Sequence, residues 1–214
     1  MSFKRNILVP VLVLLSSCFF LSCEKDDDTE HISTVTTYPV LELKGEEWIV
    51  VPQGGSYTDA GVEATLGGEP VEVAVTNLPD PNVPGVYVIT YTATNPDGFS
   101  VSITRKVGVI SAATAAMDIS GQYKRNAGAE GVSTITKLGP GFYQTDNVGG
   151  VAAPGPSTTV KFFHYEGNHL EGPPQDVLGS VFSIIDGTLN PGVSYTWTVI
   201  NPGYGDAPRT FVKQ

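Results

Sequence analysis

Residues 85–109 read GVYVITYTATNPDGFSVSITRKVGV and contain the clearest β-hairpin of the chain. Successive side chains of a strand point to opposite faces, so a strand beginning at Gly85 has two distinct faces. One face would carry Val86, Val88, Thr90 and Thr92, and the other Tyr87, Ile89, Tyr91 and Ala93. The segment Asn95-Pro96-Asp97-Gly98 has the composition of a turn. This stretch therefore predicts two antiparallel strands with an apolar inner face.

One residue of the returning strand does not fit this pattern. Arg105 falls on the apolar face of that strand, together with Val101, Ile103, Val107 and Val109. A charged side chain is costly to bury unless it has a partner. We expect Arg105 either to lie near a strand end or to pair with an acid. Tyr87 and Tyr91 are expected to pack in the core.

Similar short segments precede the hairpin. Residues 40–43, 48–51 and 71–75 are rich in strand-forming residues, and Gly- or Pro-containing turns separate them. Strands at this spacing are typical of a β-sandwich.

Three of these stretches carry a family resemblance. Residues 39–45 (PVLELKG), 55–64 (GSYTDAGVEA) and 84–94 (PGVYVITYTAT) resemble the bacterial immunoglobulin-like (Ig-like) repeat of Bacteroidetes surface proteins. The resemblance covers residues 38–110 and implies a spacer and interaction module without catalytic residues. Residues 65–68 and 95–98 depart from the family pattern, and these changes remove acids that could have held a calcium ion.

The strand pattern returns after residues 111–117, a linker of small residues that could form one helical turn. Strands are predicted at 121–125, 133–138, 142–145, 159–165, 181–185, 193–200 and 210–213, with turns at 139–141, 186–187 and 191–192 and a long loop at 149–156. The fold class is therefore all-β, with an Ig-like sandwich followed by a second antiparallel sandwich or barrel-like domain at 118–214.

This second half also resembles a known arrangement. Residues 118–125 (DISGQYKR) and 140–143 (PGFY) are similar to a C-terminal domain of unknown function in two-domain Bacteroidetes lipoproteins. The resemblance implies an accessory lipoprotein of a polysaccharide-utilisation system.

The N-terminus has the layout of a secretory signal peptide. Lys4 and Arg5 precede an apolar run at 7–15 that resumes at 19–21. Pro10 and two serines interrupt the run, which is shorter than the roughly 20 residues that a spanning helix needs. Its end resembles a bacterial lipoprotein signal, in which a cysteine receives the lipid.

Two cysteines compete for this role. Cys18 follows Leu15-Ser16-Ser17 and fits the usual pattern better, whereas Phe20 lies three residues before Cys23. We favour Cys23 as the lipidated residue, because Phe19-Phe20-Leu21 would be an unusual start for a mature protein. Residues 1–22 are then the signal peptide.

Residues 23–37 are predicted to be a flexible acidic and Thr-rich tether. Its start, CEKDDD, resembles the export signal of Bacteroidetes surface lipoproteins, which implies the outer membrane with the protein facing the cell exterior. Loss of residues 1–22 removes two basic residues and no acid, so the net charge moves from −10 to −12. The expected membrane contact is therefore through acyl chains rather than through charge.

Composition excludes several functions. The acidic chain has no clustered Lys and Arg for nucleic acid. Residues 24–214 contain no cysteine, and the three histidines show no zinc-binding spacing, so no metal or cofactor is expected. Nucleophile-elbow, P-loop and dinucleotide motifs are missing. A pair of glycosidase carboxylates stays open among Asp146, Glu166, Glu171, Asp176, Asp186 and Asp206, although we expect no enzyme.

The candidate ligand-binding residues lie in the C-terminal half. Tyr204 sits in a polar loop, and Tyr143 with Asp146 and Asn147 lies beside the Gly-rich loop. Trp197 is a further candidate, although its strand pattern favours the core.

We expect a non-catalytic surface lipoprotein that captures glycans, with a glycan or an outer-membrane uptake complex as partner. The alternatives are an adhesive protein with a protein partner and a small carbohydrate-active enzyme. Exposed aromatic rings would favour the first, an apolar patch or free strand edge the second, and a cleft with two acids the third.

Overall fold

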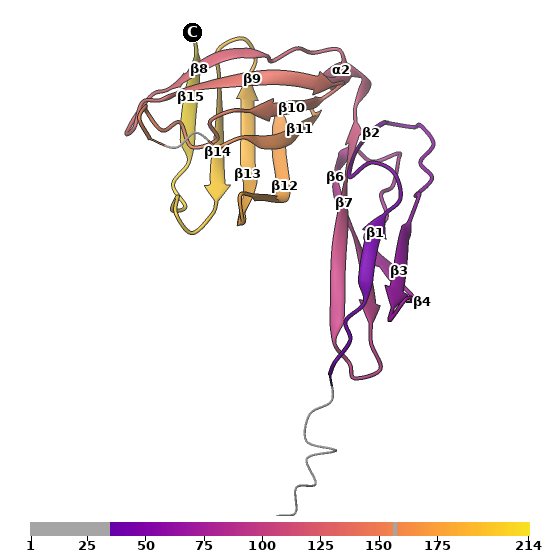
Figure 1. The fold of residues 1–214 in the computed structure, drawn as a ribbon. Helices are drawn as coiled ribbons and strands as arrows, with labels where there is room; N and C mark the ends of the chain where they lie inside the picture. Colours follow the sequence, from indigo (N-terminus) through magenta and orange to yellow (C-terminus); the bar gives the residue numbers. More distant parts are fainter. Residues whose placement is uncertain (1–34, 156–157) are drawn as a thin grey trace, which may run out of the picture. The chain divides into compact units, whose positions relative to one another are not determined.

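The computed structural model describes residues 35–155 and 158–214. Cys18, Cys23, the signal peptide and most of the tether lie outside the described residues. Among the described residues, no helix has the length and apolar composition to cross a bilayer. The fold is almost entirely β, which confirms the predicted class (Figure 1).

Two sheets form the N-terminal sandwich. One sheet has the order β1 (Val40–Leu43), β3 (Val62–Leu66), β4 (Glu69–Pro70). The other has the order β2 (Trp48–Pro52), β7 (Ser100–Ile110), β6 (Gly85–Thr94), β5 (Ala74–Thr76). All pairs are antiparallel except β2 with β7. The strand predicted at 71–75 is observed only as β5, because residues 69–70 pair with β3 and the Val71 N–H donates to the Ala64 carbonyl of β3 at 3.1 Å.

The hairpin β6–β7 supplies most of the sandwich core. Ile89, Tyr91 and Ala93 are buried, as their alternation predicts, and Ile89 lies opposite Arg105 in the register. Val51, Val107 and Val109 complete the buried cluster, with Leu41, Leu43 and Val62 packed against it from the other sheet. Burial of these side chains between two sheets stabilises the sandwich through the hydrophobic effect.

A single helical turn, α2 (Ala112–Ala115), connects the sandwich to the second half, and Ser111 caps it through its side-chain oxygen. Ser111 also donates its backbone N–H to the carbonyl of Tyr165 at 2.9 Å. The helical turn expected in this small-residue segment is confirmed.

Eight strands then close into a barrel. They are β8 (Gly121–Arg125), β9 (Val132–Gly139), β10 (Phe142–Thr145), β11 (Val160–Glu166), β12 (His169–Val177), β13 (Ser180–Asn190), β14 (Ser194–Ile200) and β15 (Arg209–Lys213). Each strand pairs antiparallel with the next, and β15 pairs with β8. A barrel of eight strands has an interior just wide enough for side chains to fill. Here the buried interior is rich in aromatic rings, including Tyr123, Tyr143, Phe162, Tyr195, Trp197 and Phe211.

Two features of the barrel correct the sequence predictions. Asp186-Gly187 does not end a strand, because β13 continues to Asn190 and its pairing with β14 shifts register between Ile185 and Thr188. Strand β12 was not predicted, since Pro173-Pro174 interrupts the strand pattern. The prolines fall where the β12–β13 register shifts between Gly172 and Gln175, and such an irregularity tolerates proline.

Candidate functional site

Two of the predicted ligand-binding residues lie inside the barrel. Tyr143 and Trp197 are both fully buried. The Tyr143 hydroxyl donates to the Met117 carbonyl at 2.9 Å, and Trp197 Nε1 donates to the Val148 carbonyl at 3.0 Å. Burial raises the pKa of Tyr143 to about 12. Because both polar groups are satisfied within the core, these rings stabilise the barrel and are not available to a surface ligand.

Asp146 and Asn147 lie together beside the Gly-rich loop. The buried Asn147 amide donates to the carbonyls of Val132 at 3.0 Å and Val151 at 2.9 Å, and its oxygen accepts from the Val151 N–H. The exposed Asp146 carboxylate accepts from the Thr134 N–H at 2.7 Å. Both side chains therefore hold the loop against β9, although they border a pocket of about 430 Å³.

Tyr204 is half-buried in a neighbouring part of the barrel rim. Its ring lies edge-on to Phe182 at 5.4 Å between centroids, and its hydroxyl is 3.2 Å from the Thr158 hydroxyl.

A larger groove lies on the outer face of the barrel, across β11, β12 and β13. Its volume is about 490 Å³, within the range typical of ligand sites. Tyr165 is on β11, His169 and Glu171 are on β12, and Ile185, Asp186 and Thr188 are on β13. Alternation within β11 places Tyr165 outward, since Phe162 and His164 are buried on the opposite face.

The polar side chains of this groove have no hydrogen-bond partner among the residues that the structure describes. Tyr165 and His169 stack with their centroids 5.8 Å apart and their planes 18° apart. Burial raises the pKa of the Glu171 carboxyl, and the described residues offer it neither a hydrogen bond nor an ion pair. Burial, followed by the negative charges of Glu171 and Glu166, raises the pKa of the Tyr165 hydroxyl. The groove thus combines an aromatic platform with an unpaired acceptor.

Sequence reasoning named Glu171 and Asp186 only as two of six scattered acids. The groove depends on β12 and on the bulge of β13, and neither was predicted. His164 and His169 are close in sequence but lie in different surroundings. His169 lines the groove, whereas His164 is buried with its Nε2 2.8 Å from the Gly167 carbonyl. Within 35–155 and 158–214, no three His, Cys, Asp or Glu side chains gather in a way that could hold a metal ion.

Comparison with known proteins identifies the sandwich. Residues 41–109 match the family described as "Bacterial surface protein, Ig-like domain". This segment is a bacterial surface Ig-like domain. The chain is also similar to a lipoprotein from Bacteroides thetaiotaomicron of known crystal structure, at 28% identity over 83% of this chain and 100% of that chain, with a TM-score of 0.38. No curated protein matches the chain.

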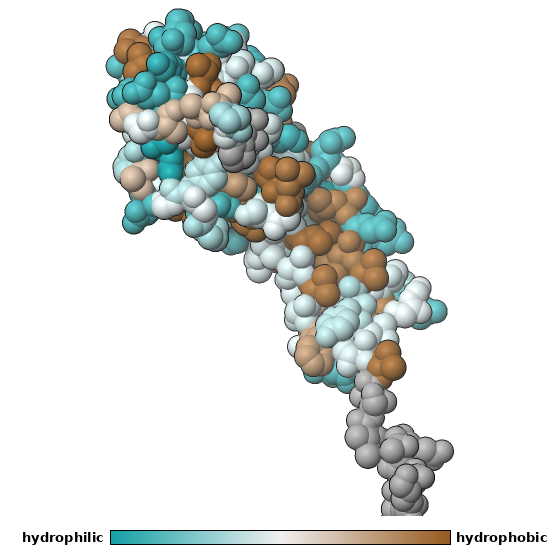
Figure 2. All heavy atoms as spheres, turned by 60° about the vertical axis from the view of Figure 1, so that its left-hand side comes forward, coloured by the Kyte–Doolittle hydropathy of each residue, from teal (hydrophilic) through white to brown (hydrophobic). Residues whose placement is uncertain are grey.

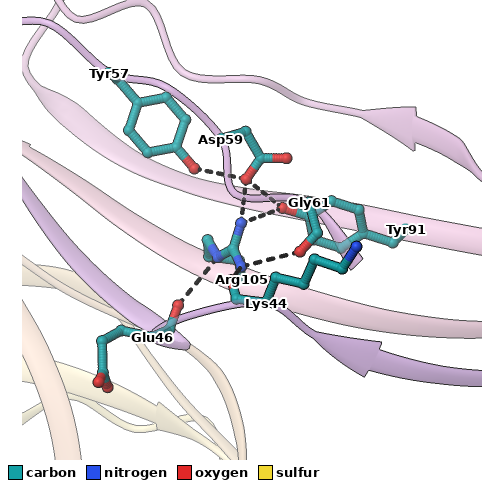
Figure 3. Close-up of polar contacts among 7 residues, drawn as sticks. All are labelled: Lys44, Glu46, Tyr57, Asp59, Gly61, Tyr91 and Arg105. Atoms are coloured by element: carbon teal, nitrogen blue, oxygen red, sulfur yellow. Dashed lines mark hydrogen bonds and ion pairs between the residues drawn. The ribbon is translucent and has the colours of Figure 1, made fainter. Parts of the chain in front are cut away.

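The Ig-like domain has a buried polar centre built on Arg105 (Figure 3). The guanidinium pairs with Asp59 and donates to the Tyr91 hydroxyl at 2.8 Å. It also donates to three backbone carbonyls, of Lys44, Glu46 and Gly61. The hydroxyls of Tyr57 and Tyr91 donate to the same Asp59 oxygen at 3.0 and 2.6 Å. The expectation that Arg105 pairs with an acid is confirmed.

Electrostatics keeps this centre ionised. Burial alone would raise the pKa of Asp59, but the hydrogen bonds from Tyr91 and Tyr57 and the charge of Arg105 outweigh it and lower that pKa. Burial and the hydrogen bond to Asp59 raise the pKa of Tyr91, so its hydroxyl stays protonated. All five N–H donors of the Arg105 guanidinium contact acceptors of the same domain. The centre therefore joins the two sheets rather than forming a ligand site.

Proposed function

We propose that the protein is a lipid-anchored cell-surface protein that captures glycans through the outer groove of its barrel and does not cleave them. The observation that carries this proposal is the half-buried Glu171 carboxylate without a partner beside the stacked rings of Tyr165 and His169. The Ig-like domain supports the surface location and would act as a spacer.

The chemistry of the groove suits a sugar. Sugar hydroxyls donate to carboxylates, and such charge-assisted hydrogen bonds are about twice as strong as neutral ones. The C–H face of a pyranose ring can pack on an aromatic ring, and Tyr165 would provide that ring here. Thr188 and Asp186 border the same groove and add further hydrogen-bonding groups.

Glycan binding is the first test. A glycan-array screen of the full chain should identify ligands, and Glu171→Gln should weaken their binding by about 10- to 100-fold, the value of a hydrogen bond to a charged group. Tyr165→Ala should weaken binding as well, because it removes the platform. Glu166→Gln is the matched control, since Glu166 is exposed at the end of β11 and does not line the groove. Unchanged binding in folded Glu171→Gln protein would contradict the proposed site.

One observation favours an enzyme as the second candidate. Glycosidases use two carboxyl groups, one of which has a raised pKa. Glu171 has this property, and Asp186 borders the same groove. Incubation of the protein with each bound glycan decides between the two functions. We expect no new reducing ends, and release that disappears in Glu171→Gln would establish the enzyme.

A protein partner has less support from the barrel than from the sandwich, whose two sheets are open. The barrel is closed and leaves no free strand edge among its described strands. On the face drawn in Figure 2, several hydrophobic residues adjoin one another along the middle of the molecule, with hydrophilic residues around them. Leu178 and Val181 are the most exposed apolar residues of the barrel and lie at the β12–β13 turn.

The anchor is tested at the cysteine that we favour. Cys23→Ala should abolish labelling by a radioactive or clickable fatty acid in cells, because the thioether then cannot form. Cys18→Ala should leave labelling intact. The reverse result would assign the lipid to Cys18. Protease added to intact cells should digest the wild-type protein, and protection would contradict surface display.

A further inference from the structure

Arg125 and Arg209 point into the same end of the barrel. Arg125 lies opposite Phe211 in the β8–β15 register, and Arg209 lies opposite Trp197 in the β14–β15 register. Phe211 and Trp197 are fully buried in the barrel interior. The two arginines line a cavity of about 250 Å³, here called the two-arginine cavity, together with Gly149, Val151, Gly203 and Tyr204.

No carboxylate neutralises this pair in the described part of the chain. The ion pairs there are Arg105–Asp59, Lys106–Glu47 and Lys124–Glu130, and none involves either arginine. Two adjacent cations without an acid are unexpected in a chain whose net charge is −10. Since like charges repel at short range, the arrangement favours an anion between them.

Backbone carbonyls hold both guanidinium groups in place. Arg209 donates through Nη1 to Ala207 at 3.1 Å and through Nη2 to Tyr204. Arg125 donates through Nη1 to Gly149 at 3.1 Å. A guanidinium has five N–H donors, so these contacts fix the orientation and leave donors unused.

One of the unused donors is buried. Arg209 is only 5% exposed, and its Nε has no hydrogen-bond partner among the described residues. Burial lowers the pKa of Arg209, and the charge of Arg125 lowers it further. A buried donor without a partner costs free energy that a bound acceptor would restore.

We infer that the two-arginine cavity binds an oxyanion, namely a carboxylate, sulfate or phosphate group of a small ligand. Guanidinium groups match such oxyanions through paired, charge-assisted hydrogen bonds. The volume is below the range of about 300–1,000 Å³ that is typical of drug-sized sites, so the cavity fits one charged group with its nearest atoms. It shares no residue with the outer groove, and its existence does not depend on glycan capture there.

Anion binding is tested by observing the arginine side chains themselves. In ¹⁵N-labelled full chain, galacturonate is titrated while the Nε–H resonances of arginine are recorded by NMR. We expect the Arg209 resonance to shift and saturate in the millimolar range. Galactose, which lacks the carboxylate, should not shift it. Inorganic sulfate and inorganic phosphate are titrated in two further experiments. The anion whose shift saturates at the lowest concentration identifies the oxyanion group that the cavity prefers.

Variants separate recognition from structure. Arg125→Gln should weaken anion binding by about 10- to 100-fold. Lys124→Gln removes the same charge from the preceding residue, whose side chain is 45% exposed, and should leave affinity within about twofold. If Arg125→Gln does not fold, Arg125→Lys replaces it and should bind more weakly because it lacks the paired donors. The inference is overturned if none of the three anions saturates, or if folded Arg125 variants bind as the wild type does.

Discussion

Asp59→Ala is expected to lower the free energy of unfolding of the Ig-like domain by about 3–5 kcal/mol, as found when one partner of a buried ion pair is removed. The side chain of Arg105 is only 2% exposed, so the variant leaves a guanidinium charge in the core. The hydroxyls of Tyr57 and Tyr91 lose their acceptor at the same time. Urea unfolding followed by circular dichroism measures the change.

The exposed pair Lys124–Glu130 provides the control. Its side chains are 45% and 58% exposed, and Lys124→Ala should cost no more than about 1 kcal/mol. A loss of similar size in both variants would mean that the Arg105 centre contributes no more than a surface ion pair.

The pH dependence gives an independent signature of the same centre. The pKa of Asp59 is lower in the folded chain than in the unfolded one, so the folded protein holds this proton less tightly. Its stabilisation is fully present above the unfolded value of about 3.9 and is lost as the pH falls through the lower folded value. Asp59→Ala should therefore lose less stability than the wild type between about pH 4 and pH 2.

Structure that depends on partners near in sequence could be predicted. The hairpin of residues 85–109 follows from its alternation, and β10 was predicted with its observed bounds. Arg105 could be recognised as a misfit because a single charge on an apolar face requires a partner. The identity of that partner could not be predicted, since Asp59 lies 46 residues away and on no predicted strand.

The barrel groove shows where sequence reasoning fails. Asp186-Gly187 has the composition of a turn, yet β13 passes through it with Asp186 at a φ of 53°. Gly187 lies so close to β12 that a Cβ there would be 2.3 Å from the Leu170 carbonyl oxygen. Turn-forming residues also form bulges, and only pairing with distant strands decides between the two. Tyr165, Glu171 and Asp186 therefore could not be assigned to one site.

Gly108→Ala is expected to destabilise the protein by about 1–3 kcal/mol through overpacking. A Cβ at Gly108 would lie 2.5 to 2.9 Å from three ring atoms of Phe163. The ring is fully buried and has little room to move, because Phe142 stacks on it at 5.0 Å and Trp48 lies at 5.7 Å. The glycine on β7 thus permits close approach of an aromatic ring from β11. Thermal unfolding of the variant measures the loss.

A second glycine in the same sheet serves as control. Gly85 lies on β6, which pairs with β7, and a Cβ there would meet Tyr87 at an ordinary distance of 3.5 Å. Gly85→Ala should change stability by less than about 1 kcal/mol and could raise it, since alanine restricts the unfolded chain. Combining Gly108→Ala with Phe163→Leu should cost less than the sum of the two single changes, because the smaller side chain relieves the clash. Additive losses would show that Phe163 is not what excludes a side chain at position 108.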